Sequence, residues 1–353
     1  MIRSCKSYII ALFCCFLFTG PVFSQDDAQE IFSKQQLEQM VAPIALYPDP
    51  LLAQILMAST YPLEIVSAAR WVKENPNLKG DELQNALQSQ TWDPSVKSLT
   101  AVPDVLNLLN VHLDETVKLG DAFLAQQKDV LNAIQDLREK AKAQNHLNTS
   151  KEQVVKVSNE APSQASSAPA SNTDMISIEP ASADVVYVPM YDTSTIYGPW
   201  PYPDYAPYSY YEPGYIAAGI LTFAAGVAVG NAIWGNFDWW RHDVNINVNR
   251  YNSFNHTNIT DNPWHHHPEH REGVPYKDKL SQERFGSHQL KDAQSRDAFR
   301  DRAQQGRQEL SKEGLGAANN KGQNLKQLDK NQLKNKPQHQ VKKPQKQNPA
   351  HGA

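Results

Sequence analysis

The chain has little cysteine, and all of it lies near the N-terminus. Cys5, Cys14 and Cys15 are its three cysteines, and they fall within a stretch that has the features of a secretory signal. A mature chain without cysteine forms no disulfide, no thiolate zinc site and no cysteine nucleophile. An exported form of this protein must therefore be held together by the packing of ordinary side chains.

The signal itself is predicted for residues 1–24. Basic residues open it, an apolar stretch from Tyr8 to Phe18 follows, and Val22 and Ser24 suit the positions before a cleavage at Gln25. A retained anchor helix is the alternative. Because no cysteine follows the apolar stretch where a lipid anchor would need one, we do not expect a lipid-anchored N-terminus.

Motifs of the common enzyme classes are also missing. The sequence contains no G-x-S-x-G, no H-E-x-x-H and no phosphate-binding glycine loop. Polar residues do occur among the predicted helices, and we interpret them as helix caps or as solvated or paired side chains: Asp49, Glu64, Arg70, Asp93 and Asp104. The sequence therefore predicts a non-enzymatic protein and names no catalytic residue.

Charge is divided along the chain. Residues 25–240 hold 12 Lys and Arg against 26 Asp and Glu, whereas residues 241–353 hold 20 against 12. A basic tail after an acidic front suggests contact with anionic surfaces, such as lipid headgroups or envelope polymers. Nucleic acid is not expected as a partner, because the tail lacks the interleaved aromatic residues of a single-strand binder. Export would also remove the protein from the compartment that holds nucleic acid.

The predicted fold is mainly α. Residues 33–147 form the expected all-α domain, which opens with a capping box at Ser33 and Gln36. Prolines follow Asp49 and Asp93, where a first helical position tolerates the missing N–H. Apolar residues at helical spacing predict one long helix from about His112 to Ala143.

The rest of the chain is less regular. Residues 148–175 are Ser-, Ala- and Asn-rich and predict a flexible linker. Short strands are expected within residues 176–260, including a half-buried strand over Asp243 to Tyr251, where valine and isoleucine alternate with asparagine. Residues 261–353 contain histidines, turn basic and are expected to be largely disordered.

An uncharged run from Tyr215 to Gly235 spans 21 positions. It contains small residues spaced four apart: Gly214, Ala218, Thr222, Gly226 and Gly230. On a helix of about 31 Å, this glycine-zipper-like spacing would form one face for close packing, either in a membrane or against a second copy of the chain. A buried soluble helix or helical hairpin is the alternative. Aromatic residues at both ends resemble a membrane-interface belt: Tyr211, Tyr215, Trp234, Trp239 and Trp240.

Histidines gather after residue 241. The segment from His265 to His270 is the one plausible metal cluster, with His266 and His270 four positions apart. That spacing suits two ligands on one helical face, although Pro268 disfavours a regular helix between them. Neutral imidazoles suit zinc, copper or nickel. The alternative is a polar tail segment without a physiological metal.

Several long strings together resemble a known family. They are residues 41–56, Ala68 to Trp71, Asp184 to Pro189, Tyr197 to Pro201, Val244 to Tyr251 and His270 to Tyr276. The chain resembles an exported bacterial family catalogued as domain of unknown function 3300, over roughly residues 33–286. The resemblance implies an envelope protein of Gram-negative bacteria, and it implies histidines at positions 266 and 270. It implies no activity and no catalytic residue.

Two hypotheses follow. The first is a non-enzymatic, membrane-associated structural or interaction protein of the cell envelope, which docks to a membrane, an envelope component or a second copy through residues 214–235. The second is a soluble periplasmic metal-binding or chaperone-like protein that uses the histidines of residues 265–270 to bind zinc or copper.

Overall fold

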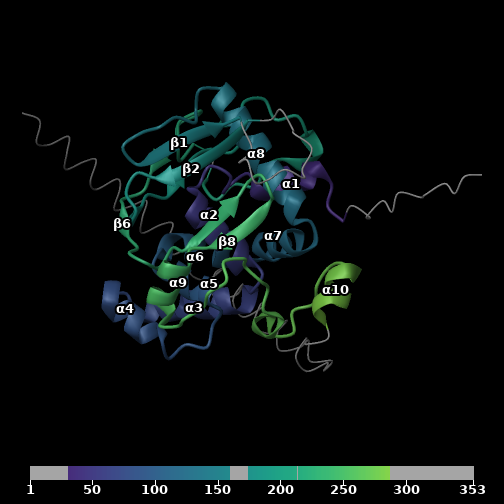
Figure 1. Ribbon diagram of the computed structural model, residues 1–353. Coiled ribbons are helices and arrows are strands. Elements are labelled where there is room, and N and C mark those ends of the chain that lie inside the picture. The colour runs from purple at the N-terminus through teal and green to yellow at the C-terminus, as the bar shows by residue number, and fades with distance from the viewer. Residues whose placement is uncertain (1–30, 160–173, 213, 287–353) are drawn as a thin grey trace, which may run out of the picture. The chain divides into compact units, whose positions relative to one another are not determined.

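The computed structural model describes residues 31–159, 174–212 and 214–286. Helices dominate these ranges (Figure 1), so the prediction of a mainly helical protein is confirmed. The first eight helices are α1 Lys34–Val41, α2 Asp49–Ser59, α3 Pro62–Glu74, α4 Gly80–Leu87, α5 Pro94–Leu99, α6 Pro103–Val111, α7 Leu113–Ala125 and α8 Gln127–Ala143. Two more, α9 Val248–Asn255 and α10 Lys279–Phe285, follow the strands.

Helix α2 lies at the centre of the core. All of its residues except Pro50 are buried. Helices α3, α5 and α7 and the strands β2 and β7 pack around α2. A helix that is apolar on every side needs cover on every side. Gly120 lets α7 approach most closely, because a Cβ at this position would lie 2.2 Å from the backbone oxygen of Ser59.

Strands add four small antiparallel sheets. The pairs are β1 Gln153–Ser158 with β2 Met175–Pro180, β3 Val185–Val186 with β6 Val227–Ala228, β4 Pro189–Met190 with β5 Thr222–Phe223, and β7 Gly235–Asp238 with β8 Asp243–Ile246. Figure 1 shows β1 and β2 beside α8 and α2. Gly235 lets β7 approach α2 closely, because a Cβ there would lie 2.9 Å from the Cβ of Ala53.

A buried ion pair joins the helices to the strands. Arg138 of α8 donates to the backbone oxygens of Ala45, Tyr47 and Ile176, and its guanidinium lies 2.7 Å from Asp49. The other carboxylate oxygen of Asp49 accepts from the indole of Trp239 at 2.8 Å. Asp49 was expected to cap α2, but no side-chain cap bond is formed there. Its carboxylate binds Arg138 instead.

The uncharged run is not helical. Residues 215–235 hold only the short strands β5 and β6 and the start of β7, so the prediction of an apolar helix or helical hairpin is wrong. Gly219 and Gly230 have φ values of +66° and +48°, which interrupt a right-handed helix. The five small residues therefore share no helix face: Gly214, Ala218, Gly226 and Gly230 are exposed, and Thr222 lies in β5.

The aromatic residues beside this run divide between core and surface. Trp234 and Trp239 are 1% and 7% exposed, so an interfacial position is wrong for both. Trp240 is half-buried. Tyr211 and Tyr215 stack with ring centroids 5.9 Å apart, and Tyr215 is 63% exposed.

Three other expectations need correction. The long helix over residues 112–143 is broken at Gln126, whose side chain pairs with the backbone of Phe32. The predicted linker contains β1, which pairs with β2. The strand predicted over Asp243 to Tyr251 ends at Ile246, because the side chain of Asn247 caps α9.

The expected tail is partly ordered. Residues 261–286 include the 3₁₀ helix η2 Pro268–Arg271 and α10, and Arg271, Val274 and Tyr276 are buried. Another 3₁₀ helix, η1, spans Pro203–Tyr205, within a stretch rich in tyrosine and proline at residues 197–215. The predicted signal, residues 160–173 of the linker and the tail beyond residue 286 lie outside the described residues. Within the described ranges, no single helix is long and apolar enough to cross a bilayer, and α2 with α3 meets that test only as a pair bent by 114°.

Candidate metal centre

Two carboxylates of the candidate site are placed by helix starts. Pro62 opens α3 and puts Glu64 in its first turn, and Pro94 opens α5 directly after Asp93. Asp93 is the N-cap of α5: its Oδ1 accepts from the backbone N–H of Ser95 at 2.8 Å and from the Ser95 hydroxyl at 2.5 Å. The cap leaves Oδ2 of Asp93 available to another donor.

The histidines come from η2 and the residue directly before it: His270 lies in η2, and His267 precedes Pro268, more than 170 positions after Asp93. Arg271 fixes this segment: it donates to the backbone oxygen of Thr60 at 3.0 Å and to Asp121 at 2.5 Å, and it is fully buried. The backbone N–H of His267 also donates to the hydroxyl of Tyr61 at 2.8 Å. These bonds hold η2 against the start of α3.

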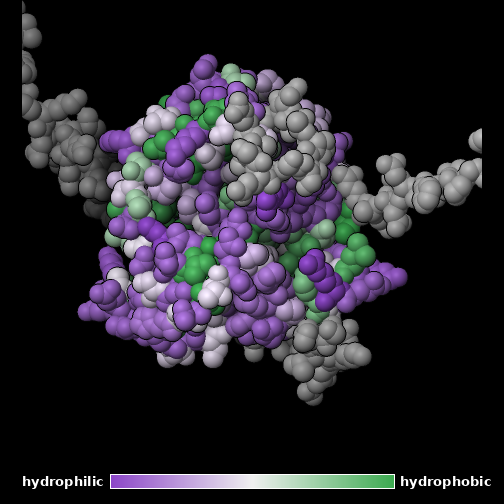
Figure 2. Space-filling view, in the orientation of Figure 1, coloured by the Kyte–Doolittle hydropathy of each residue, from purple (hydrophilic) through white to green (hydrophobic). Residues whose placement is uncertain are grey.

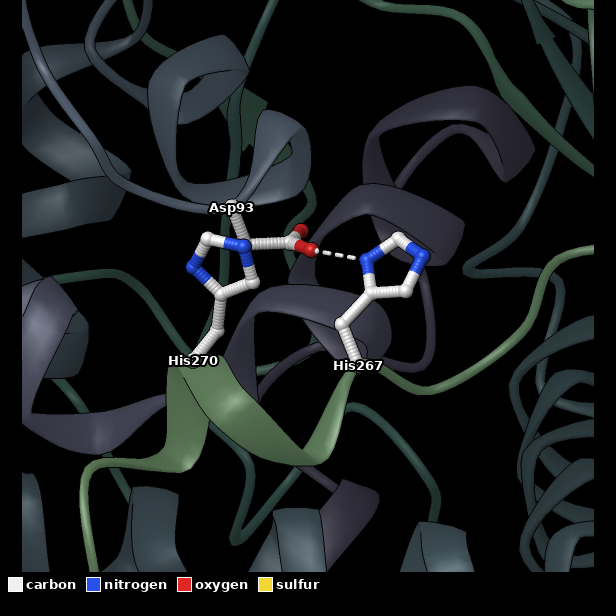
Figure 3. Close-up of side chains that lie close together, drawn as sticks. All are labelled: Asp93, His267 and His270. Atoms are coloured by element: carbon white, nitrogen blue, oxygen red, sulfur yellow. Dashed lines mark hydrogen bonds and ion pairs between the residues drawn. The ribbon is translucent and has the colours of Figure 1, made fainter. Parts of the chain in front are cut away.

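Three side chains converge between these elements. Asp93, His267 and His270 each offer one ligand atom, and the three atoms lie within 4.8 Å of one another. Figure 3 shows the two imidazoles rising from η2 on either side of the Asp93 carboxylate. Nδ1 of His267 donates to Oδ2 of Asp93 at 2.8 Å. Two imidazoles and a carboxylate are a ligand set that zinc and related metals accept.

Glu64 sets the orientation of His270. Its Oε1 accepts from Nδ1 of His270 at 2.7 Å, while Oε2 accepts from the backbone N–H of Asp93 at 2.7 Å. The ring nitrogen that remains, Nε2, is left as an acceptor, and Figure 3 shows one nitrogen of His270 beside the Asp93 carboxylate. Metal-binding histidines commonly have such a carboxylate partner on the other ring nitrogen.

The charges of the site are coupled. Burial raises the pKa of Glu64 to about 7, although its bond to His270 acts in the opposite direction. Burial alone would raise the pKa of Asp93, but bonds from His267 and Ser95 hold it below its ordinary value. The carboxylate partners raise the pKa values of His267 and His270. The site therefore holds protons near neutral pH that a bound cation would displace.

Comparison with known proteins identifies the family. The family described as "Protein of unknown function (DUF3300)" matches residues 33–271. The chain belongs to this family. It is also similar to the uncharacterized protein YacH of Escherichia coli (strain K12), with 36% identity over 76% of this chain and 52% of that protein. The chain thus spans about half the length of this curated relative. No solved structure matches it.

The DUF3300 match contains every residue of the candidate site. It ends at Arg271, the residue that anchors η2, and so includes His267 and His270, which lie in the region predicted from the sequence to be a tail. The family description gives no activity.

The site is open on one side. The side chain of His267 is 44% exposed and that of His270 is 24% exposed, whereas the two carboxylates are nearly covered. A cavity of about 320 Å³ adjoins Asp93 and His267 and is walled by Trp234, Tyr251, Trp264 and others. Small molecules can therefore reach the cluster from solvent.

The structure separates the two predicted metal ligands. His270 belongs to the cluster, but Nε2 of His266 lies 2.8 Å from the hydroxyl of Tyr276 and its ring stacks on Tyr61 at 5.1 Å. Burial and the nearby Arg271 lower the pKa of His266 to about 3, which keeps it neutral. His265 is exposed on the wall of the cavity. His266 is thus placed as a packing residue.

Sequence reasoning missed the other members of the site. Asp93 and Glu64 were noticed, but only as caps or solvated groups, and His267 was passed over for His266. One signal was present: η2 is a 3₁₀ helix with about three residues per turn, so residues three apart share a side. His267 and His270 have that spacing. Nothing in the sequence indicates that Glu64 and Asp93 lie beside them.

Proposed function

We propose that this chain is an exported cell-envelope protein that binds a divalent transition metal through Asp93, His267 and His270. The convergence of their three ligand atoms within 4.8 Å carries the proposal. Glu64 supports it by fixing the ring nitrogen that His270 presents. The alternative hypothesis from the sequence, a metal-binding protein of the periplasm, is thus favoured over the structural one, with a different set of ligands.

Zinc is the metal that fits best. Two imidazoles and one carboxylate leave a fourth tetrahedral position for water or another ligand. Catalytic zinc sites have this arrangement of three protein ligands and one open position. Ligand atoms at about 2.0–2.2 Å from zinc are roughly 3.3 Å apart in a tetrahedron. The 2.8 Å between His267 and Asp93 must therefore open slightly, which small side-chain rotations allow. Copper and nickel accept the same donors.

A zinc titration of the full chain tests the proposal. The protein is prepared free of metal, without an affinity tag, and titrated in competition with a chromophoric chelator. We expect one site of sub-micromolar dissociation constant. His267→Gln and His270→Gln should each weaken it at least tenfold, since each removes one of three ligands.

The matched control is His265→Gln, which removes a neighbouring exposed histidine outside the cluster. Its zinc affinity should equal that of the original protein. The proposal fails if all three variants bind zinc alike, because the metal would then be held by scattered surface histidines rather than by this site.

Export and envelope location form a second part of the proposal. They rest on the basic and apolar pattern of residues 1–24. Cell fractionation with protease accessibility tests them: the mature chain should begin near Gln25 and be degraded only when the outer membrane is opened. Degradation only after cell lysis would place the chain in the cytoplasm and contradict export.

Association with a membrane or with a second copy has a narrower basis than the sequence suggested. Tyr215 and Ile220 are 63% and 48% exposed, and they support a contact made by the loop between η1 and β5. On the face that Figure 2 shows, hydrophilic residues predominate and apolar ones form separate patches. A carbonate wash of membranes tests the idea: release of all the mature protein, without crosslinked oligomers, would refute it.

A further inference from the structure

A second open site contains none of the three candidate ligands and lies between the β1–β2 sheet and the β7–β8 hairpin. It is a groove of about 680 Å³ whose walls include Ser177 and Glu179 of β2 and Asn236 and Asn245 of the hairpin. This volume is within the range of small-ligand sites. We propose that the groove binds an uncharged oligosaccharide, and foremost one made of N-acetylated sugars.

The charged side chains on the groove walls are already paired inside the protein. Asp49 pairs with Arg138, Glu179 with Lys156, Asp238 with Arg241, and Arg250 with Asp184. A charged ligand would have to compete with these partners. An uncharged ligand would leave all four pairs intact, so the charge pattern of the groove favours neutral polar molecules over anionic or cationic ones.

Carboxamides supply hydrogen-bonding groups that are not committed elsewhere. Asn236 and Asn245 are directly opposite each other in the β7–β8 register, so their side chains lie on the same face about 5 Å apart at Cβ. Among the described residues, neither side chain has a hydrogen-bond partner. Asn247 continues the row, and although its oxygen caps α9, its amide group keeps its donors.

The chemistry of a carboxamide matches that of a sugar. Each amide offers two N–H donors and a C=O acceptor in one plane, and pairs well with vicinal hydroxyls that both donate and accept. An acetamido group presents one N–H and one C=O, the complement of a single asparagine side chain. Two facing asparagines can therefore hold an N-acetylated sugar by paired hydrogen bonds.

Trp240 provides the apolar surface that a sugar ring also needs. It lies two residues after the end of β7, is half-buried and lies on the wall of the groove. Its neighbour Trp239 is buried, with its ring under the guanidinium of Arg138 at 4.8 Å. Trp240 has no such ring or cation partner among the described residues. Its indole is available to the C–H face of a pyranose, a contact that aromatic rings make well because they bury much apolar area.

Calorimetric titration of the full mature chain with tetra-N-acetylchitotetraose tests this proposal, with cellotetraose and polygalacturonate in parallel. We expect binding of the N-acetylated tetrasaccharide, weaker binding of cellotetraose and none of the polyanion. The double variant Asn236→Ala with Asn245→Ala should weaken binding at least tenfold, as should Trp240→Ala. The asparagine pair is the more decisive, since neither residue makes side-chain bonds that folding requires.

Asn249→Ala is the matched control, because Asn249 is an exposed asparagine close in sequence but outside the groove. It should bind like the original chain. Binding should also persist in a chelator and in His267→Gln, which separates this inference from the metal site. No heat with any tetrasaccharide at millimolar concentration would overturn the proposal. So would binding of polygalacturonate alone, or equal binding by the asparagine double variant and the control.

Discussion

Glu64 and His270 are 206 positions apart in sequence, yet Oε1 of Glu64 accepts a 2.7 Å hydrogen bond from Nδ1 of His270. The same carboxylate receives the backbone N–H of Asp93 on its other oxygen. One buried side chain thus places two of the three candidate ligands. It holds the imidazole of His270 in the tautomer that leaves Nε2 able to bind a cation.

Glu64→Gln should weaken zinc binding without removing a ligand. The amide keeps one acceptor but replaces the other with a donor, so it cannot accept from both His270 and Asp93. Loss of such a partner typically costs ten- to a hundredfold in metal affinity. The measurement is a competitive zinc titration. Glu74→Gln changes an exposed residue of the same helix and should bind like the original, and equal affinities for both variants would contradict the role given to Glu64.

Arg138→Met should destabilise the fold. It would leave the buried carboxylate of Asp49 without its cation, and the backbone oxygens of Ala45 and Tyr47 would lose the bonds that Arg138 donates. Breaking one partner of a buried pair costs about 3–5 kcal/mol. Chemical denaturation of the metal-free protein measures the change. Arg241→Met removes an exposed partner of Asp238 and should cost less than about 1 kcal/mol. A similar loss in both variants would refute the structural role of Arg138.

His266 should make the protein sensitive to acid. Its folded pKa of about 3 lies below the roughly 6.5 of an unfolded chain. Between these values the unfolded state binds the proton, so the free energy of unfolding falls as the pH is lowered from about 7 toward 3. At pH 5 the loss from this one group is about 2 kcal/mol at most.

Denaturation at pH 7 and pH 5, in a chelator, compares the original protein with His266→Gln. The variant should lose less stability on acidification, by up to that amount. His265→Gln, which alters an exposed histidine, should behave like the original. An identical pH dependence in His266→Gln would show that protonation of His266 is not coupled to unfolding.

Gly120→Ala should disrupt the packing of α7 on α2. Its Cβ would lie 2.2 Å from the oxygen and 2.6 Å from the carbon of the Ser59 carbonyl, and backbone cannot yield as a flexible side chain can. Overpacking of this kind costs about 1–3 kcal/mol or more. Thermal unfolding checks it against Gly286→Ala, where the nearest atom is 3.9 Å away. Equal melting temperatures for the two variants would contradict the contact.

The helices were predictable where local signals determine them. Proline at the first position and an aspartate or serine cap are properties of a few adjacent residues. Helix α1 begins after the cap Ser33, and α5 begins at Pro94 after the cap Asp93, as these signals predict. The prediction for the uncharged run was wrong because small residues four positions apart share one face only if the backbone is helical, and this spacing does not itself make a helix. Gly219 and Gly230 instead adopt positive φ, and the strands β5 and β6 pair with β4 and β3, at least 30 positions upstream.

The site was only partly predictable for a related reason. The sequence identifies a histidine-rich segment, but it does not show whether neighbouring side chains repeat every three or every four residues. The 3₁₀ geometry of η2 selects His267 with His270, whereas an α-helix would have selected His266. The carboxylates come from α3 and the start of α5, and only tertiary packing brings them to η2.

The docking of η2 through Arg271 determines when the candidate centre can exist. Its carboxylates are synthesised early and its imidazoles more than 170 residues later, so a nascent or truncated chain that stops before Trp264 would have acidic side chains here and no histidine. Zinc loading would then report that the segment of η2 has been synthesised and has packed against the helices that precede it. Metal content in a cell extract would thus distinguish mature molecules from degraded or incomplete ones.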